Sequence, residues 1–500
     1  MNEVIVRARY GVLRGRETAN GQEFLGIRYG EPPVGERRWA APLRYRPSDD
    51  RVDATRFGPS PPQLPSPATS WRPVVAPREM SEDCLNLNVW TPAADGARRP
   101  VLVHVFGGGF ETGSASEGLQ DGAALSAQAD AVVVRVNFRI GALGFLYLGD
   151  ACGADFAAGN AGLLDLHLAL EWVRENIGAL GGGPDKVTLF GLSSGAFMIA
   201  ALLALPEARG LFAKAWMQSG SASRVLTRSQ AGASAEEFLR EVGLAPGDRY
   251  GLASLGVGAI LAAHRKIAAL DLGDRNAPGG RTLGIVEDGV TLTRHPMLAL
   301  ASGERRDTPI VLGFTRDEAR LWFASGAMRL PQEMDDVRAE MIRFSDAWRG
   351  AQLFGFYRAR HPDLDPVGLR ERFLSDAVYG VPALRTALAH RDAGGASFLY
   401  RFDWSAPGAA AALGASHGFD EAFIWNAADA TRFPLAAGDA AAGGLGEAMS
   451  EALIAFARSG SPGWPSLSDS PTMRLFGARG AAVAEIDQQL LGAWDGVARR

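Results

Sequence analysis

Ser193 lies in the pentapeptide Gly-Leu-Ser-Ser-Gly at 191–195, which matches the Gly-x-Ser-x-Gly pattern of an activated serine nucleophile. The apolar run VTLF at 187–190 precedes it and is typical of a short strand, and the apolar run that follows is typical of a helix. A serine on such a turn is lifted clear of the backbone, and the N–H groups that start the helix favour negative charge beside it. The context predicts a nucleophile elbow, and with it acyl transfer through a covalent intermediate.

The same pattern occurs a second time, as GASHG at 414–418. A chance match is expected in a chain so rich in glycine. We expect no strand directly before this copy and no apolar helix after it. We therefore interpret Ser416 as a loop residue and keep Ser193 as the nucleophile.

A serine nucleophile needs a histidine base and an acid that orients the base, and around a nucleophile elbow these follow in the chain order serine, acid, histidine. His417 lies between Gly414 and Gly418, downstream of the strand-like run 397–402, and fits this order. The other histidines precede the serine, precede a proline or lie in helix-like stretches: His104, His167, His264, His295, His361 and His390.

The acid should lie between the serine and the histidine, just after a strand. The run PIVLGF at 309–314 is followed by TRDEAR, which offers Asp317 and Glu318. Spacing alone does not decide between these two carboxylates.

The strand-like run VLVHVF at 101–106 leads into three glycines, Gly107, Gly108 and Gly109. Successive glycines allow backbone N–H groups to converge on one point, as an oxyanion hole requires. The N–H of Ser194, directly after the nucleophile, is the other expected donor. No phosphate-binding glycine motif, no H-E-x-x-H and no C-x-x-C is completed, so we expect no metal and no cofactor.

The elements that must position these residues follow from the apolar pattern. Continuously apolar runs separated by helical patterns predict a mostly parallel sheet with helices on both faces, a doubly wound α/β architecture. We expect one domain over 1–500, helical cap excursions around 228–280 and 320–395, and a surface loop in the proline-rich segment 59–67. The strand-like runs are 101–106, 131–137, 187–190, 215–218, 309–314 and 397–402, and 165–177 has helical spacing.

Composition limits the partners. A net charge of −5, from 51 basic and 56 acidic residues, gives no reason to expect a nucleic acid or an anionic membrane surface as a partner. No apolar run is long enough to span a membrane, and the N-terminus has no apolar stretch of signal-peptide length. With only Cys84 and Cys152, a disulfide framework is not indicated. We expect a soluble, cytoplasmic protein, and the sequence does not determine its oligomeric state.

Taken together, these motifs identify a likeness to a known family. The chain resembles the type-B carboxylesterases, or carboxylesterase/cholinesterase family, and in particular its bacterial members, from 10–15 through to 450–462. The resemblance implies the α/β-hydrolase fold and hydrolysis of a small-molecule ester. The blocks that carry it are SEDCLNLNVW (81–90), FGGGF (106–110), NFRIGALGFL (137–146), GNAGLLDLHLALEWVRENI (159–177) and HGFD (417–420).

The resemblance also implies roles for single residues. In the family a strand is followed by Asp-Glu, with the Glu in the catalytic triad, so TRDEA implies Glu318. The implied triad is Ser193, Glu318 and His417. The implied oxyanion donors are the N–H groups of Gly108, Gly109 and Ser194.

Four positions depart from the family pattern. Leu192 stands where the family usually has Glu before the serine, which removes a carboxylate beside the nucleophile. Pro61 stands where many members have a cysteine that pairs with the one matching Cys84, so this disulfide cannot form. Leu166 replaces a common Gln, and Ala319 replaces the Gly after the acid. Because Leu192 brings no negative charge, we do not expect a preference for cationic alcohols.

The main hypothesis is a serine carboxylic-ester hydrolase that acts through an acyl-enzyme on small, uncharged or apolar esters. One alternative is the same triad cleaving amide, carbamate or thioester bonds. The alternative from a different class is a non-catalytic, cholinesterase-like binding protein on the same fold. All three triad positions are retained, which argues against the non-catalytic alternative.

Overall fold

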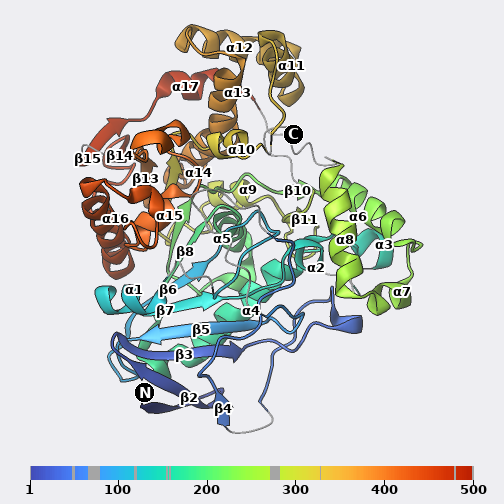
Figure 1. Ribbon diagram of the computed structural model, residues 1–500, viewed down its shortest axis with the longest axis vertical. Helices are drawn as coiled ribbons and strands as arrows, with labels where there is room; N and C mark the ends of the chain where they lie inside the picture. Colours follow the sequence, from blue (N-terminus) through green and yellow to red (C-terminus); the bar gives the residue numbers. More distant parts are fainter. Residues whose placement is uncertain are drawn as a thin grey trace.

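The computed structural model describes residues 2–47, 51–65, 79–116, 121–153, 156, 159–270, 282–326, 328–477 and 480–497. Within them, thirteen strands form one sheet in the order β1-β2-β3-β5-β7-β6-β8-β9-β12-β13-β14-β15, with β4 beside β2 (Figure 1). The strands are β1 (Glu3–Ala8), β2 (Gly11–Thr18), β3 (Gly21–Arg28), β4 (Arg51–Asp53), β5 (Asn86–Thr91), β6 (Arg99–Val105), β7 (Val132–Val136), β8 (Gly182–Leu192), β9 (Lys214–Gln218), β12 (Ile310–Thr315), β13 (Ser397–Phe402), β14 (Thr472–Gly477) and β15 (Gly480–Glu485), and a separate pair is β10 (Leu226–Thr227) and β11 (Val286–Glu287).

The centre of this sheet is parallel. Parallel pairing runs from β7 through β6, β8, β9, β12 and β13 to β14. Strands with helices on both faces have no polar side, which is why the chain shows continuous apolar runs here instead of alternation. Each of the six predicted strand-like runs coincides with one of these central strands to within one residue at each run's ends or lies inside it, so the predicted α/β architecture is confirmed.

Antiparallel strands extend the sheet at both ends, and they were not among the strands predicted from the sequence. β1, β2, β3, β5 and β7 pair antiparallel in succession, and β14 pairs antiparallel with β15. Several of these strands have an exposed or half-buried face, so their apolar pattern is weaker than that of the central strands.

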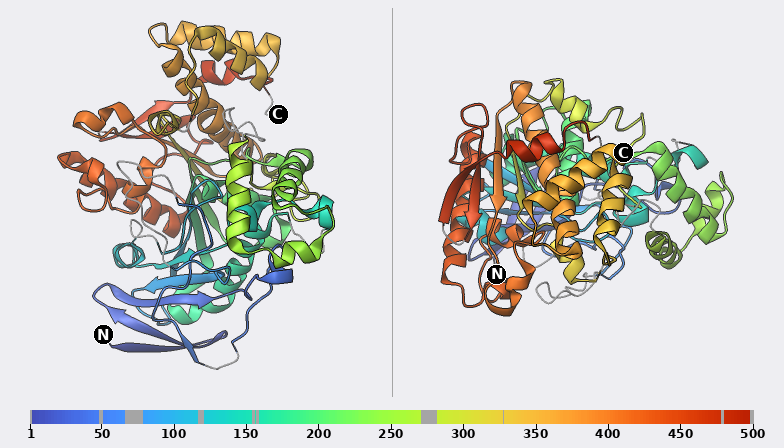
Figure 2. Two further views of the ribbon diagram at one scale, coloured as in Figure 1. Left: turned by 45° about the vertical axis from the view of Figure 1, so that its right-hand side comes forward. Right: turned by 90° about the horizontal axis from the view of Figure 1, so that it is seen from above.

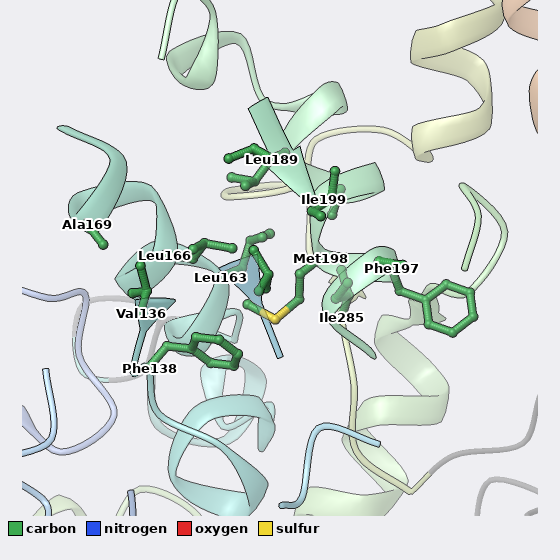
Figure 3. Packing of buried hydrophobic residues seen from close by; sticks show 14 of the residues in the cluster. Val136, Phe138, Leu163, Leu166, Ala169, Leu189, Phe197, Met198, Ile199 and Ile285 are labelled. Atoms are coloured by element: carbon green, nitrogen blue, oxygen red, sulfur yellow. The ribbon is translucent and has the colours of Figure 1, made fainter. Parts of the chain in front are cut away.

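Helices cover both faces of the sheet. Along β6, Val101 and Val103 belong to one apolar cluster and Leu102 to a second, so the two clusters lie on opposite faces. The first cluster packs α4 and α5 against the strands (Figure 3), and the second lies under α1, α15 and α16. The helices are α1 (Gly122–Ala129), α2 (Gly141–Phe145), α3 (Gly149–Cys152), α4 (Ala161–Asn176), α5 (Ser194–Ala204), α6 (Arg228–Val242), α7 (Arg249–Ser254), α8 (Val257–Ala269), α9 (Pro296–Ala301), α10 (Arg320–Ala324), α11 (Met334–Phe344), α12 (Ala347–Arg360), α13 (Pro366–Ser375), α14 (Val381–Asp392), α15 (Phe419–Ile424), α16 (Ala440–Ser459) and α17 (Gln488–Ala493).

The predicted excursions contain helices. The segment 228–270 forms α6, α7 and α8, and residues 271–280 of this prediction lie outside the described residues. In the segment 320–395, helices α11 to α13 join α17 at one end of the molecule, around a third apolar cluster (Figures 1 and 2). α14 contacts β12 and β13 and so covers the sheet. The single domain over 1–500 stays a prediction.

The proline-rich segment 59–67 is not the surface loop that we expected. Residues 60–63 are buried, and residues 66–67 lie outside the described residues. The side-chain amide of Gln63 donates to the C=O of Gly113 at 3.0 Å and accepts from its N–H at 2.9 Å. Composition was misleading here because Pro61 and Pro62 are buried and Gln63 is bound to the loop that follows β6.

Two further predictions concern a disulfide framework and a membrane-spanning segment. Cys84 and Cys152 are both buried and not bonded to each other. Across the described ranges, no helix is both long and apolar enough to cross a membrane.

Candidate active site

Ser193 occupies a strained turn between β8 and α5. Its φ of 55° and ψ of −120° are rare for a residue with a side chain, and such strain clusters at functional sites. Its N–H donates to the C=O of Gln218 at 2.8 Å. A Cβ on Gly191 or on Gly195 would overlap the carbonyl oxygen of Val105 in β6. The two glycines are therefore required because the neighbouring strand passes so close, and the sharp strand-to-helix turn expected at Ser193 is present.

His417 and Glu318 are brought together by the loops after β13 and β12. Nδ1 of His417 and Oε2 of Glu318 are 2.6 Å apart. The other oxygen, Oε1, accepts from Oγ of Ser219 at 2.6 Å and from the N–H of Thr315 at 2.8 Å. Glu318 is completely buried, so this carboxylate is held in one position by three hydrogen bonds.

Asp317, the alternative acid, points elsewhere. Its Oδ2 accepts from the N–H of Ala415 at 2.9 Å and from the guanidinium of Arg316 at 2.9 Å. Burial opposes ionisation of this group, but these hydrogen bonds and the positive charges of Arg316 and Arg320 together outweigh it and lower the pKa of Asp317. The structure thus places Glu318, and not Asp317, against His417.

Two aromatic rings pack against the His417 imidazole, and the sequence reading missed both. The rings of Tyr379 and Trp322 have centroids 4.8 Å and 5.2 Å from the imidazole centroid. They stack on each other at 5.7 Å with an interplanar angle of 9°. Tyr379 comes from a π-helical turn, η4 (Asp376–Gly380), a rare conformation that is frequent at functional sites. The only signal in the sequence is that Trp322 follows Glu318 by about one helical turn.

The glycine turn after β6, Gly107 to Gly109, lies beside Ser193. Gly108 and Gly109 have φ values of 120° and 68°, where a side chain would be strained. A Cβ on Gly107 would lie 2.8 Å from the carbonyl oxygen of Leu192 and 3.3 Å from Cβ of Ser193. Gly107 thus lies against Ser193, with Gly108 and Gly109 next along the chain and Ser194 as the first residue of α5.

Ser193 and His417 lie in less close contact than His417 and Glu318 do. Their loops touch, because a Cβ on Gly418 would lie 3.4 Å from Cδ2 of Leu192. No hydrogen bond joins Ser193 to His417 among the described residues. Catalytic hydrogen bonds are often long in an unliganded enzyme and shorten with substrate.

Ser416, in the second Gly-x-Ser-x-Gly copy, lies in a loop as predicted. It is buried, and its Oγ donates to the C=O of Leu413 at 2.5 Å. A short buried helix, α15, does follow this copy from Phe419, but two of its six residues are the acids Asp420 and Glu421. Because β13 ends far upstream, at Phe402, the copy still lacks the strand that would make it an elbow.

A second buried acid, Asp420, lies three residues after His417, and the sequence reading gave it no role. Its Oδ2 accepts from Tyr400 Oη at 2.8 Å and from Gln218 Nε2 at 3.0 Å. Burial raises the pKa of Asp420 to about 6, although these hydrogen bonds oppose the rise.

The site holds no candidate metal centre. Within the residues that the structure describes, no group of three or more histidine, cysteine, aspartate or glutamate side chains could hold a metal ion. The chemistry that the described side chains offer is that of a serine, an imidazole and a buried carboxylate.

Known proteins match this chain over nearly its whole length. A model of the carboxylesterase family matches residues 2–490. The para-nitrobenzyl esterase of Bacillus subtilis is 37% identical over 406 residues, which cover 81% of this chain and 79% of that protein. The phenmedipham hydrolase of Pseudarthrobacter oxydans is 32% identical over 486 residues, which cover 92% of each.

Solved structures agree with these relatives. A carboxylesterase of Geobacillus stearothermophilus is 33% identical with a TM-score of 0.85, and the match covers 98% of this chain and 100% of that one. A thermophilic para-nitrobenzyl esterase is 30% identical with a TM-score of 0.88, at the same coverage. Because both the sequence and the α/β-hydrolase fold match throughout, the chain belongs to the carboxylesterase family and is a carboxylic ester hydrolase.

Proposed function

We propose that Ser193, His417 and Glu318 form the catalytic triad of this hydrolase. The observation that carries the proposal is the 2.6 Å hydrogen bond between His417 and the completely buried Glu318, next to the strained turn at Ser193. A buried carboxylate on Nδ1 holds the imidazole in the tautomer that leaves Nε2 free to accept a proton.

In the proposed reaction, Oγ of Ser193 attacks the ester carbonyl while Nε2 of His417 takes the serine proton. His417 then gives this proton to the leaving alcohol, and an acyl-enzyme remains. Water attacks the acyl-enzyme with the same base, which releases the carboxylic acid and restores Ser193. The N–H groups of the glycine turn and of Ser194 stabilise the oxyanion of both tetrahedral intermediates, and no cofactor takes part.

The substrates that we propose are small, uncharged or apolar esters. Leu192, a buried apolar residue, lies beside the nucleophile and brings no negative charge to attract a cationic alcohol. The rings of Trp322 and Tyr379 add an apolar wall at His417. The name of the Bacillus relative suggests para-nitrobenzyl esters as the first compounds to assay.

A panel of esters tests this proposal, with neutral and choline esters of equal acyl length and with para-nitrobenzyl esters. We expect kcat/KM for neutral esters to equal or exceed that for choline esters. A fluorophosphonate should label the wild type at Ser193 and should fail to label a folded Ser193→Ala variant. Labelling of Ser416, or an active Ser193→Ala variant, would overturn the assignment.

The compartment is a separate proposal. A cytoplasmic location stays a prediction from composition, and fractionation of the host cells with immunoblotting would test it.

A further inference from the structure

The first strand forms an open edge of the sheet. Among the described residues, the only strand that pairs with β1 is β2. The β1–β2 hairpin lies at the lower end of the molecule, near the N-terminus marker and away from α5 and its elbow (Figure 1). An edge strand presents N–H and C=O groups that can pair with another chain.

The pairing with β2 determines which backbone groups of β1 face this open edge. The N–H of Glu17 donates to the C=O of Asn2 at 3.0 Å, so these two residues form a hydrogen-bonded pair. In an antiparallel ladder such pairs recur at every second residue, and the regular register of β1 on β2 continues them through the even-numbered residues. The N–H and C=O groups of Glu3, Ile5 and Arg7 therefore point outward.

The side chains of the same three residues share one face of the strand, since alternate residues of a strand point to the same side. Glu3, Ile5 and Arg7 are all exposed, with Ile5 at 59%, whereas Val6 between them is buried. On this face of β1 the apolar side chain of Ile5 thus lies between the acidic Glu3 and the basic Arg7.

This order of residues is complementary to itself. If two copies of β1 pair antiparallel about a two-fold axis at Ile5, each Ile5 faces the other and each Glu3 faces Arg7 of the second copy. All three pairs fall on residues whose backbone groups point outward, so every pair is of the hydrogen-bonded kind. Opposite charges directly across two strands attract each other, and like charges there repel.

We propose that β1 is a self-association edge through which two copies of this chain form a two-fold dimer with one continuous sheet. The contact is isologous, because the same surface serves on both copies. Glu3 already pairs with Arg14 of β2 at 2.8 Å. Its two carboxylate oxygens can accept from both Arg14 and Arg7 of the second copy.

The dimer is expected to be weak. A strand of six residues on each side covers less than the roughly 800 Å² per partner that stable interfaces bury. The dimer fraction should therefore rise with protein concentration, and added salt should weaken the outer charged pairs.

Sedimentation velocity of the full chain, from about 1 µM to about 500 µM, tests the association. Ile5→Lys places two ammonium groups against each other on the axis and should weaken the dimer at least about tenfold. The matched control is Leu298→Lys, because Leu298 is 61% exposed on α9 and lies outside the proposed contact. Thermal melts and ester hydrolysis confirm that each variant is folded.

Charge reversal tests the pairing. Arg7→Glu alone and Glu3→Arg alone should each weaken the dimer, because like charges then face each other. The double variant, Glu3→Arg with Arg7→Glu, should restore it. A protein that is monomeric at every concentration, or a dimer that Ile5→Lys leaves unchanged, would overturn the proposal.

Disulfide trapping tests the register, since only a residue on the axis faces its own copy. Paired residues of the hydrogen-bonded kind have Cα atoms about 5.5 Å apart, within the range that a disulfide spans. Ile5→Cys should give a covalent dimer under mild oxidation, and Arg7→Cys should not. The native Cys84 and Cys152 are buried and do not interfere. Equal crosslinking of both variants would contradict the register.

Discussion

Two neighbouring carboxylates, Asp317 and Glu318, show how finely a single residue determines the chemistry. Glu318 reaches His417 with one oxygen and is fixed by Ser219 and Thr315 through the other. Asp317 instead accepts hydrogen bonds from Arg316 and from the N–H of Ala415, which lies in the loop before His417.

The two acids should therefore respond very differently to removal of the charge. Glu318→Gln should lower kcat on the order of 10⁴-fold, because an amide cannot hold the imidazole in its working tautomer. Asp317→Asn should leave kcat within roughly an order of magnitude of the wild type. Steady-state kinetics on one neutral ester compare the two, with thermal melts as the folding control. The reverse ranking would transfer the role to Asp317.

Leu192 offers a second test at this scale. Leu192→Glu puts a carboxylate beside the nucleophile, and negative charge there favours the imidazolium form of His417. Because the base must be neutral, the acidic limb of kcat/KM against pH should move to higher pH. Leu192→Gln is the matched control for shape without charge. An acidic limb that stays in place in a folded Leu192→Glu variant would show that the added carboxylate is protonated or screened.

Asp420 gives a pH dependence of stability. Its pKa is raised by burial from 3.8 to about 6, so the folded state holds the proton more tightly than the unfolded state does. Stability from this group is present below the unfolded pKa and is lost as the pH rises towards 6, at a cost of about 3 kcal/mol at most. Asp420→Asn keeps the shape and removes the titration.

The expected result for Asp420→Asn is a gain in stability over the wild type that is small near pH 4 and larger near pH 7. Denaturant unfolding of both proteins at several pH values measures this difference. A difference that does not change with pH would mean that Asp420 does not titrate in this range.

At the scale of elements, α5, which follows Ser193, is held at its C-terminal end. Ser193 stands at its N-cap position without a side-chain capping bond, whereas Arg305 donates to three carbonyls at the other end. Nε donates to Leu203 at 2.8 Å, and Nη2 donates to Leu205 at 2.5 Å and to Leu202 at 3.3 Å. A cation is favourable at a helix C-terminus, while burial lowers the pKa of Arg305 to about 10.

Arg305→Met should destabilise the protein by about 2–3 kcal/mol, because buried carbonyls lose a charged donor. Below the melting transition, kcat should change little, since the other end of α5 keeps its contacts. The control is Arg228→Met, which removes an exposed ion pair with Asp150 and should cost far less stability than Arg305→Met. Chemical unfolding measures both, and equal losses would refute the capping role.

A feature could be predicted when the residues that cause it are neighbours in the sequence. The central strands, the elbow and the glycine turn were predicted because burial on both faces and tight turns leave continuous apolar runs and glycines in the chain. Tyr379 could not be predicted, because its place at His417 depends on a π-helical turn far along the chain. Gln63 was missed for the same reason, since its partner Gly113 lies fifty residues away.

At the scale of the whole molecule, the C-terminal helix α17 is linked to the site through a buried chain of contacts. Nε1 of Trp494 donates to Oη of Tyr357 at 3.0 Å, and Tyr357 donates to Oδ2 of Asp376 at 2.9 Å. Asp376 begins the π-helical turn that carries Tyr379 to His417. The third apolar cluster thus supports one wall of the candidate site from outside the sheet.

Trp494→Ala should therefore affect both stability and activity. Removing a buried Trp costs about 3–5 kcal/mol, and loss of the cluster should loosen the turn that positions Tyr379. We expect kcat/KM on a neutral ester to fall while fluorophosphonate labelling of Ser193 persists. Trp348→Ala is the matched control, because Trp348 is 66% exposed on α12 and its removal should change stability by no more than about 0.5 kcal/mol. If Trp494→Ala loses stability but keeps full kcat/KM well below its melting temperature, the cluster supports the fold alone and does not position the site.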